Sequence, residues 1–170
     1  MLKKILFFVF FGLVMGHQAF TMTIAFACFQ NINAHENSRN ITGMFEDLLF
    51  EPFFDSGFIV TNVPLAKYSS EKDITLAKIK KFFEEEPSDY LVLLNFEYGE
   101  NLVFDKKTQE KVPDWKRLKV SLYEFADENE IFTKVIDINR IKGSNPERKA
   151  ESLSGQTASE ILAALKKNKK

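Results

Sequence analysis

The segment that most constrains the fold runs from Tyr90 to Tyr98, because its first half, Tyr-Leu-Val-Leu-Leu, is apolar without interruption. Such a run is typical of a central strand covered on both faces, whereas a strand with one face in water alternates. A second apolar run, Thr23 to Phe29, ends in the polar loop that begins at Gln30, and predicts another buried strand. Two buried strands require helices on the faces of the sheet.

Two stretches with helical spacing separate the predicted strands. In the first, one stripe carries the apolar residues Ile41, Met44, Phe45, Leu48 and Leu49. Asn37 or Ser38 can cap this helix, and Pro52 interrupts or kinks it. Gly57 suits the left-handed position that follows a helix. The second predicted helix covers residues 70–86 and opens with Ser70 and Asp73, a variant of the capping box.

The remaining elements complete a mixed α/β (α+β) fold. Residues 58–63 predict a strand between the two helices, 115–125 and 130–141 predict a hairpin, and 101–113 predict a polar loop or a short edge extension. Thr157 and Glu160 form a second capping box, which predicts that the last helix starts there. The order is β-α-β-α-β-β-β-α. Right-handed crossovers then predict some parallel pairing, in a mixed sheet of about five strands with helices packed on it.

The first residues predict an export signal. Two lysines precede the uncharged apolar stretch Ile5 to Gly16, which together read as a secretory signal peptide over residues 1–19, cleaved near Ala19. The alternative is an uncleaved leader that associates the protein with a membrane, since residues 5–29 hold few polar side chains. We expect a single α/β domain over 20–142, and a polar linker with a Lys-rich C-terminal helix over 143–170.

Composition excludes several classes of function. The 23 Lys and Arg against 24 Asp and Glu leave no positive excess, so we expect no nucleic-acid partner. One cysteine, Cys28, and two histidines make a disulfide framework or a metal centre improbable. The loop after the first strand has no glycine, and no G-x-S-x-G occurs, so neither a dinucleotide site nor a serine-hydrolase elbow is expected. We predict no cofactor, no metal and no catalytic residue.

Two groups of residues are candidates for binding. Asn33, His35 and Glu36 lie in the loop after the first strand, and ligands dock at the carboxyl ends of strands in α/β sheets. His35 and Glu36 could also form an acid–base couple. Phe50, Phe53 and Phe54 do not all fit one helical stripe, so some must lie at the Pro52 kink, where an exposed aromatic patch would mark an interface.

The stretch from Thr23 to Ile141 resembles a group of bacterial envelope domains. Their pattern is an apolar strand that ends in Phe and Asn, a polar loop, a helix, then a glycine and a further strand. It is matched here by 24–31, 41–50 and 56–60, with looser matches at 77–79 and 89–92. The group includes the periplasmic domain of the curli secretion channel, the lipoprotein activators of penicillin-binding proteins and the amino-terminal domain of the Tol-Pal propeller protein. The resemblance implies an assembly, scaffold or activator role through protein contacts and supplies no catalytic residue; unlike its lipoprotein members, this sequence has no convincing lipid-attachment cysteine.

We therefore expect an exported, periplasmic, non-catalytic protein that binds an envelope protein through a sheet edge or the aromatic kink. Two alternatives remain open. One is a small-ligand carrier with a Phe-lined pocket. The other is an enzyme whose site near His35 includes Asn33 and Glu36. The oligomeric state is left open.

Overall fold

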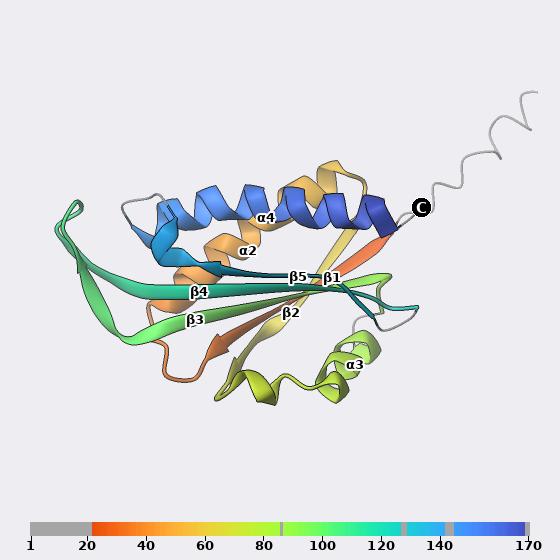
Figure 1. Cartoon of the computed structure of the whole chain (residues 1–170), viewed down its shortest axis with the longest axis horizontal. Coiled ribbons are helices and arrows are strands. Elements are labelled where there is room, and N and C mark those ends of the chain that lie inside the picture. Colours follow the sequence, from red (N-terminus) through yellow and green to blue (C-terminus); the bar gives the residue numbers. More distant parts are fainter. Residues whose placement is uncertain (1–21, 86, 127–128, 142–144, 169–170) are drawn as a thin grey trace, which may run out of the picture.

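A five-stranded mixed sheet with helices on both faces forms the body of the molecule (Figure 1). The computed structural model describes residues 22–85, 87–126, 129–141 and 145–168. The predicted signal peptide, residues 1–19, lies outside this range. No helix among the described residues has the length and apolar character needed to cross a bilayer.

The elements follow one another in the predicted order, with two short 3-10 turns added. They are β1 (Thr23–Asn31), α2 (Ser38–Asp55), β2 (Ile59–Tyr68), η1 (Glu71–Asp73), α3 (Leu76–Glu85), β3 (Tyr90–Asp105), β4 (Glu110–Glu124), β5 (Asn129–Asp137), η2 (Ile138–Arg140) and α4 (Pro146–Asn168). The predicted fold class is confirmed.

The strand order across the sheet is β2-β1-β3-β4-β5. β1 is parallel to both of its neighbours, and β3, β4 and β5 pair antiparallel, so the predicted parallel pairs and hairpin are both present. Asp89 sets the register where β1 and β3 begin. Its carboxylate accepts from the backbone N–H of Thr23 at 2.7 Å, and its own N–H donates to the Thr23 hydroxyl at 2.9 Å.

Alternate residues of the central strands build two cores, one on each face of the sheet. On one face, Phe26 of β1 and Leu94 of β3 pack under α2 and α4 in the larger apolar cluster. On the other face, Phe29 of β1 packs against Phe82 of α3, with ring centroids 5.4 Å apart. The continuous apolar run of β3 is thus explained, because helices cover both of its sides.

The last helix begins earlier than predicted. α4 starts at Pro146 rather than near Thr157, and the Asn145 side chain accepts from the backbone N–H of Arg148 at 3.0 Å, as an N-cap does. Thr157 is buried inside the helix and caps nothing. The expectation of a polar linker before the helix is wrong for Ala150 and Leu153, which lie in the larger core.

Two other helix ends differ in detail from the prediction. The Ser70–Asp73 capping box is present, but it caps the N-terminus of the 3-10 turn η1. The helix α3 begins only at Leu76. α2 runs past Pro52 to Asp55, and Asn37 occupies its N-cap position without a side-chain hydrogen bond. Gly57 has φ of +82°, the left-handed conformation predicted for it.

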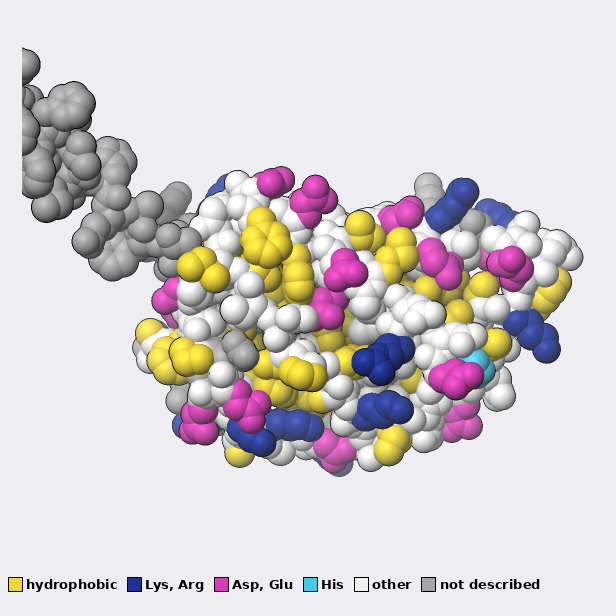
Figure 2. All heavy atoms as spheres, turned by 180° about the vertical axis from the view of Figure 1, so that it is seen from behind, with side chains coloured by type: hydrophobic (Ala, Val, Ile, Leu, Met, Phe, Trp, Pro, Cys, Tyr) yellow, Lys and Arg dark blue, Asp and Glu magenta, His cyan; other side chains and the backbone are white. Residues whose placement is uncertain are grey.

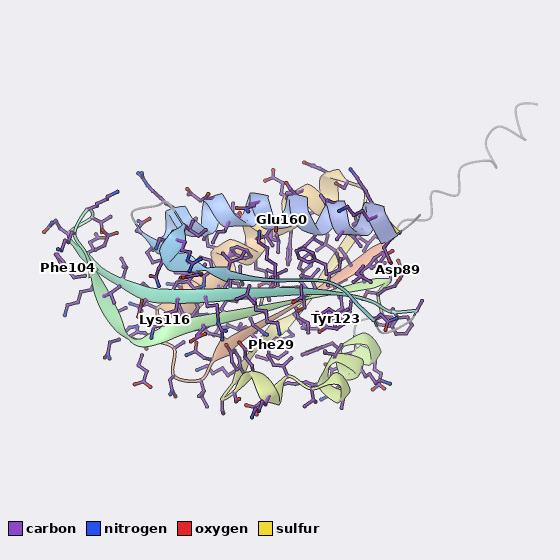
Figure 3. The ribbon with its side chains drawn as sticks, viewed as in Figure 1. Phe29, Asp89, Phe104, Lys116, Tyr123 and Glu160 are labelled. Atoms are coloured by element: carbon purple, nitrogen blue, oxygen red, sulfur yellow. The ribbon has the colours of Figure 1, made fainter. Side chains whose placement is uncertain are left out.

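β3 and β4 continue beyond the sheet as a two-stranded arm, defined here as residues 99–113. Of the two alternatives predicted for 101–113, a polar loop or an edge extension, the structure has the paired extension, with Val103 opposite Val112. A Cβ on Gly99 would come within 2.5 Å of the Asp114 carboxylate, so a larger residue where the arm leaves the body would require the Asp114 side chain to move. Phe104 is 57% exposed, and Figure 3 shows it at the outer end of the arm.

Candidate functional site

The carboxyl ends of β1 and β2 meet at a point where the chain turns to opposite faces of the sheet. β1 leads into α2, which packs on the larger core, whereas β2 leads through η1 into α3 on the other face. In α/β sheets a crevice forms between two such strands, and ligands bind there. Two cavities open at this place, one toward α3 and one toward α2.

The cavity toward α3 has a volume of about 270 Å³ and lies among polar side chains. The Asn31 amide donates to the Tyr98 carbonyl at 2.9 Å and accepts from the Tyr98 N–H at 2.8 Å, which holds β1 against the irregular part of β3. Arg117 of β4 donates to Glu97 at 2.7 Å and is also ion-paired with Glu71. Because these two carboxylates occupy its guanidinium, Arg117 closes the wall of the cavity.

Tyr68 forms the floor between these groups. Its hydroxyl donates to the Phe96 carbonyl at 3.3 Å. Burial, followed by the nearby carboxylates Glu97 and Glu71, raises the pKa of Tyr68 to about 12. The phenol therefore stays protonated at neutral pH and acts as a hydrogen-bond donor, not as a base. Asn33 lies on the rim and donates to Glu100 at 2.9 Å.

The cavity toward α2 has a volume of about 260 Å³, and His35 and Glu36 are among the residues that line it. Nδ1 of His35 accepts from the Asn37 N–H at 3.2 Å, so the other ring nitrogen, Nε2, carries the proton of the neutral ring. No hydrogen bond joins His35 to Glu36, and the structure places them side by side without forming the predicted acid–base couple.

The three phenylalanines of the predicted kink have different environments. Phe53 is fully buried, and its ring lies 5.2 Å from that of Phe26. Phe50 is half-buried and packs 4.9 Å from the same ring, measured between centroids. Phe54 is 55% exposed, so it alone of the three presents most of its side chain to a partner.

The two edges of the sheet differ in their capacity to accept another strand. β2, one edge, carries Pro64, which has no N–H to donate, and its register with β1 shifts between Ala27 and Phe29. Proline and bulges are devices that block pairing at an edge. β5, the other edge, also has a register shift, at Ile131, but it has no proline, and no described strand pairs with its outer side. Val135 on β5 is 55% exposed.

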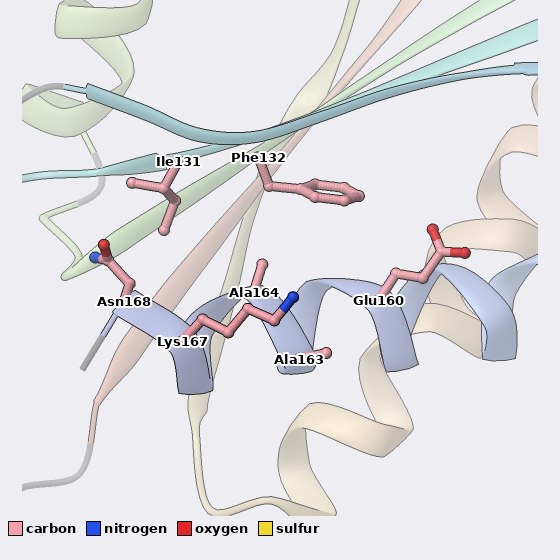
Figure 4. A pocket seen from close by; sticks show the side chains of 7 residues that line it. All are labelled: Ile131, Phe132, Glu160, Ala163, Ala164, Lys167 and Asn168. Atoms are coloured by element: carbon pink, nitrogen blue, oxygen red, sulfur yellow. The ribbon is translucent and has the colours of Figure 1, made fainter. Parts of the chain in front are cut away.

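A groove runs between β5 and α4 and encloses about 460 Å³. Figure 4 shows Ile131 and Phe132 of β5 directed toward α4, with Ala164 facing them from the helix. The small side chains of Ala163 and Ala164 leave this space open, while Glu160, Lys167 and Asn168 form its polar rim. We name this feature, together with the outer side of β5, the β5 edge groove.

An ion pair joins Lys134 of β5 to Glu160 of α4. Lys134 of β5 donates to both carboxylate oxygens of Glu160, the longer contact being 2.7 Å. Burial raises the pKa of Glu160, but hydrogen bonds from Lys134 and Gln156 outweigh it and hold that pKa below its ordinary value. Glu160 is therefore ionised at neutral pH. An edge lysine usually repels an incoming strand, and here its charge is compensated.

The face of the molecule opposite to the view of Figure 1 has no single dominant charge. Seen from behind in Figure 2, basic and acidic side chains are interspersed, with hydrophobic side chains between them. This matches the near-equal counts of 23 basic and 24 acidic residues.

These features define the class: an α/β domain with a doubly covered mixed sheet and one open sheet edge. The chain belongs to a protein family whose model is described as "Uncharacterised protein", which matches residues 23–166. No curated protein matches the chain.

Several solved bacterial structures are similar in fold, all at low sequence identity. Protein XCC0632 from Xanthomonas campestris is 11% identical, with a TM-score of 0.49 over 90% of this chain and 92% of that one. PelC from Paraburkholderia phytofirmans, crystallised as a dodecamer, is 12% identical, with a TM-score of 0.45 over 85% and 87%. TolB from Acinetobacter baumannii is 10% identical, with a TM-score of 0.42 over 85% of this chain and 28% of that one.

Sequence reasoning located the loop at the carboxyl end of β1 but missed the residues that other strands bring to it. Tyr68, Lys67 and Arg117 come from β2 and β4, and only the strand order places them beside Asn31. The sequence also did not predict the groove between β5 and α4, because alanines such as Ala163 and Ala164 contribute little to a hydrophobic pattern.

Proposed function

We propose that this chain is an exported, non-catalytic assembly module of the bacterial envelope that binds a partner protein by adding a strand at the β5 edge groove. The observation that carries the proposal is the contrast between the two sheet edges. β2 carries Pro64, which has no N–H to donate, whereas β5 has no proline and lies beside an apolar groove with no described strand on its outer side.

The groove gives such a strand a place for side chains. In strand addition, backbone hydrogen bonds supply affinity and pockets for alternate side chains supply specificity. A partner strand beside β5 would direct every second side chain toward α4, where Ile131, Phe132 and Ala164 form an apolar floor. The occupant is therefore an extended segment with apolar residues at alternate positions.

The predicted signal peptide supports the location. Residues 1–19 have the basic start and apolar stretch of a secretory leader.

Site-specific photo-crosslinking in cells tests the proposal. A photoreactive amino acid is placed at Val135 on β5 and, as a matched control, at Ile59 on β2, which are 55% and 50% exposed. We expect one dominant adduct at Val135, mapped by mass spectrometry to an extended segment of one envelope protein, and no such adduct at Ile59. Ile131→Asp in the groove should abolish the Val135 adduct. Equal labelling at both edges, or adducts at Ile59 alone, would refute strand addition at β5.

A further inference from the structure

The cavity toward α2 holds unpaired positive charge beside a buried amide. Gln30, Arg39 and Lys67 all line its volume of about 260 Å³. Within the described part of the chain, neither Arg39 nor Lys67 forms an ion pair. Arg117 and Lys134, by contrast, are held by carboxylates and are not available to a ligand.

Gln30 is the second, independent sign of a ligand. The residue is only 4% exposed, and its side-chain amide forms no hydrogen bond with any described residue. Its nitrogen and oxygen are not among the buried atoms shut off from solvent, so the amide remains open to a molecule in the cavity. The amide belongs to the lining of the cavity, so a molecule bound there would satisfy it.

The sheet register holds two of these groups together. Gln30 of β1 and Lys67 of β2 are direct partners in a parallel pair, so their side chains leave the same face of the sheet. Arg39 comes from the first turn of α2, above that face. This turn contains no acidic residue, and a cation there opposes the positive end of the helix dipole. A bound anion would relieve that conflict.

The backbone of α2 does not itself provide the donors. The first N–H groups of the helix are already used, since Ser38 donates to the His35 carbonyl at 2.9 Å and Arg39 to the Glu36 carbonyl at 3.2 Å. The donors left for a ligand are the side chains of Arg39, Lys67 and Gln30, with Nε2–H of His35 at the wall.

We propose that this cavity binds a small carboxylate, with Arg39 and Lys67 on the carboxylate oxygens and the Gln30 amide as a further donor. Two cations against the one carboxylate of Glu36 leave a local charge that matches a monoanion better than a phosphate dianion. Ala34 and Leu65 supply an apolar wall for a short carbon chain. The volume lies just below the roughly 300 Å³ at which ordinary ligand pockets begin, so the ligand is small. This site is independent of the β5 edge groove.

NMR titration of the protein recovered from cells that express the whole gene tests this site, with sodium butyrate as the probe. We expect shifts of the Gln30 side-chain amide and of the backbone amides of residues 35–39. Arg39→Gln combined with Lys67→Gln should weaken butyrate at least tenfold. The matched control, Lys72→Gln with Arg148→Gln, removes the same charge from two exposed residues elsewhere and should leave binding unchanged.

Two further arms make the test decisive. Gln30→Leu removes the amide but keeps a side chain of similar size, so it should weaken butyrate without lowering the melting temperature. A tripeptide with a free carboxyl end that binds where its amidated form does not would identify a protein terminus as the source, and butyrate binding alone would indicate a free metabolite. Tighter binding of inorganic phosphate than of butyrate, equal loss in the control variant, or no shift at millimolar butyrate would overturn the proposal.

Discussion

Phe53 and Phe54 are adjacent in the chain but lie in opposite environments. Phe53 contacts the rings of Phe26 and Phe58, with centroids 5.2 and 5.9 Å away, whereas Phe54 is 55% exposed. On a helix, neighbouring positions are turned by about a quarter of a circle, so one can enter the core while the next meets water.

Substitution of these two residues should separate folding from binding. Phe53→Ala should lower the free energy of unfolding by about 3–5 kcal/mol, because it leaves a cavity among packed rings. Phe54→Ala should change it by less than about 0.5 kcal/mol. Chemical denaturation of both variants measures the difference. Similar losses for the two would mean that Phe54 is covered in solution.

The sequence predicts the burial of a side chain only where large apolar residues are regularly spaced. Periodicity identified the stripe of α2 because Ile41, Phe45 and Leu49 are large and regularly spaced, and all three are buried. It could not assign Phe50, Phe53 and Phe54, since a run of aromatics at the end of a helix is compatible with more than one stripe. Nor could it place Gln30, whose burial depends on what α2 and β2 put beside it.

At the scale of elements, the first half of α4 was not predicted as a helix because many of its buried residues are small. Its buried face against α2 includes Ala150, Ser154, Thr157 and Ala158 alongside larger apolar residues. Such residues have a weak hydrophobic signal, so residues 146–156 look like a polar linker in the sequence. They form an interface because small side chains allow two helices to approach closely, as ridge-and-groove packing requires.

A matched pair of substitutions on α4 tests this interface. Ala158→Leu should lower the free energy of unfolding by about 1–3 kcal/mol, because the added atoms have no space between α4 and α2. Ser152→Leu, at an exposed position of the same helix, should change it by less than about 0.5 kcal/mol. Thermal and denaturant unfolding report both. A neutral result for Ala158→Leu would show that the two helices are loosely packed.

At the scale of the whole molecule, stability should be distributed unevenly. β1 and β3 lie in the middle of the sheet with a core on each face, whereas the arm, residues 99–113, has only two strands and an exposed tip. An isolated two-stranded hairpin is marginal in water.

Hydrogen exchange should reveal this gradient. We expect amides of β1 and of 90–98 to exchange only through global unfolding, and amides of 101–112 to exchange much faster. Mass spectrometry of peptic fragments over a time course measures both. Slow exchange in the arm, equal to that of β1, would contradict the description of the arm as a free extension.

The topology of the sheet could be predicted from the sequence, but which of its edges can accept another strand could not. Two strand-helix-strand units and a terminal hairpin leave few possible sheets, so the mixed sheet followed from the order of elements. Whether an edge is open depends on details such as Pro64 meeting a register shift opposite Cys28, and on which helix lies beside β5. Those details arise only when distant segments come together.

The proline in the edge strand β2 has a consequence for stoichiometry. A sheet that can grow at both edges can add copies without end, whereas Pro64 on β2 leaves β5 as the more open edge of the described strands. In the proposed strand addition, the added strand would occupy that edge. Association by this route would then stop at a pair, with the domain at the end of a sheet.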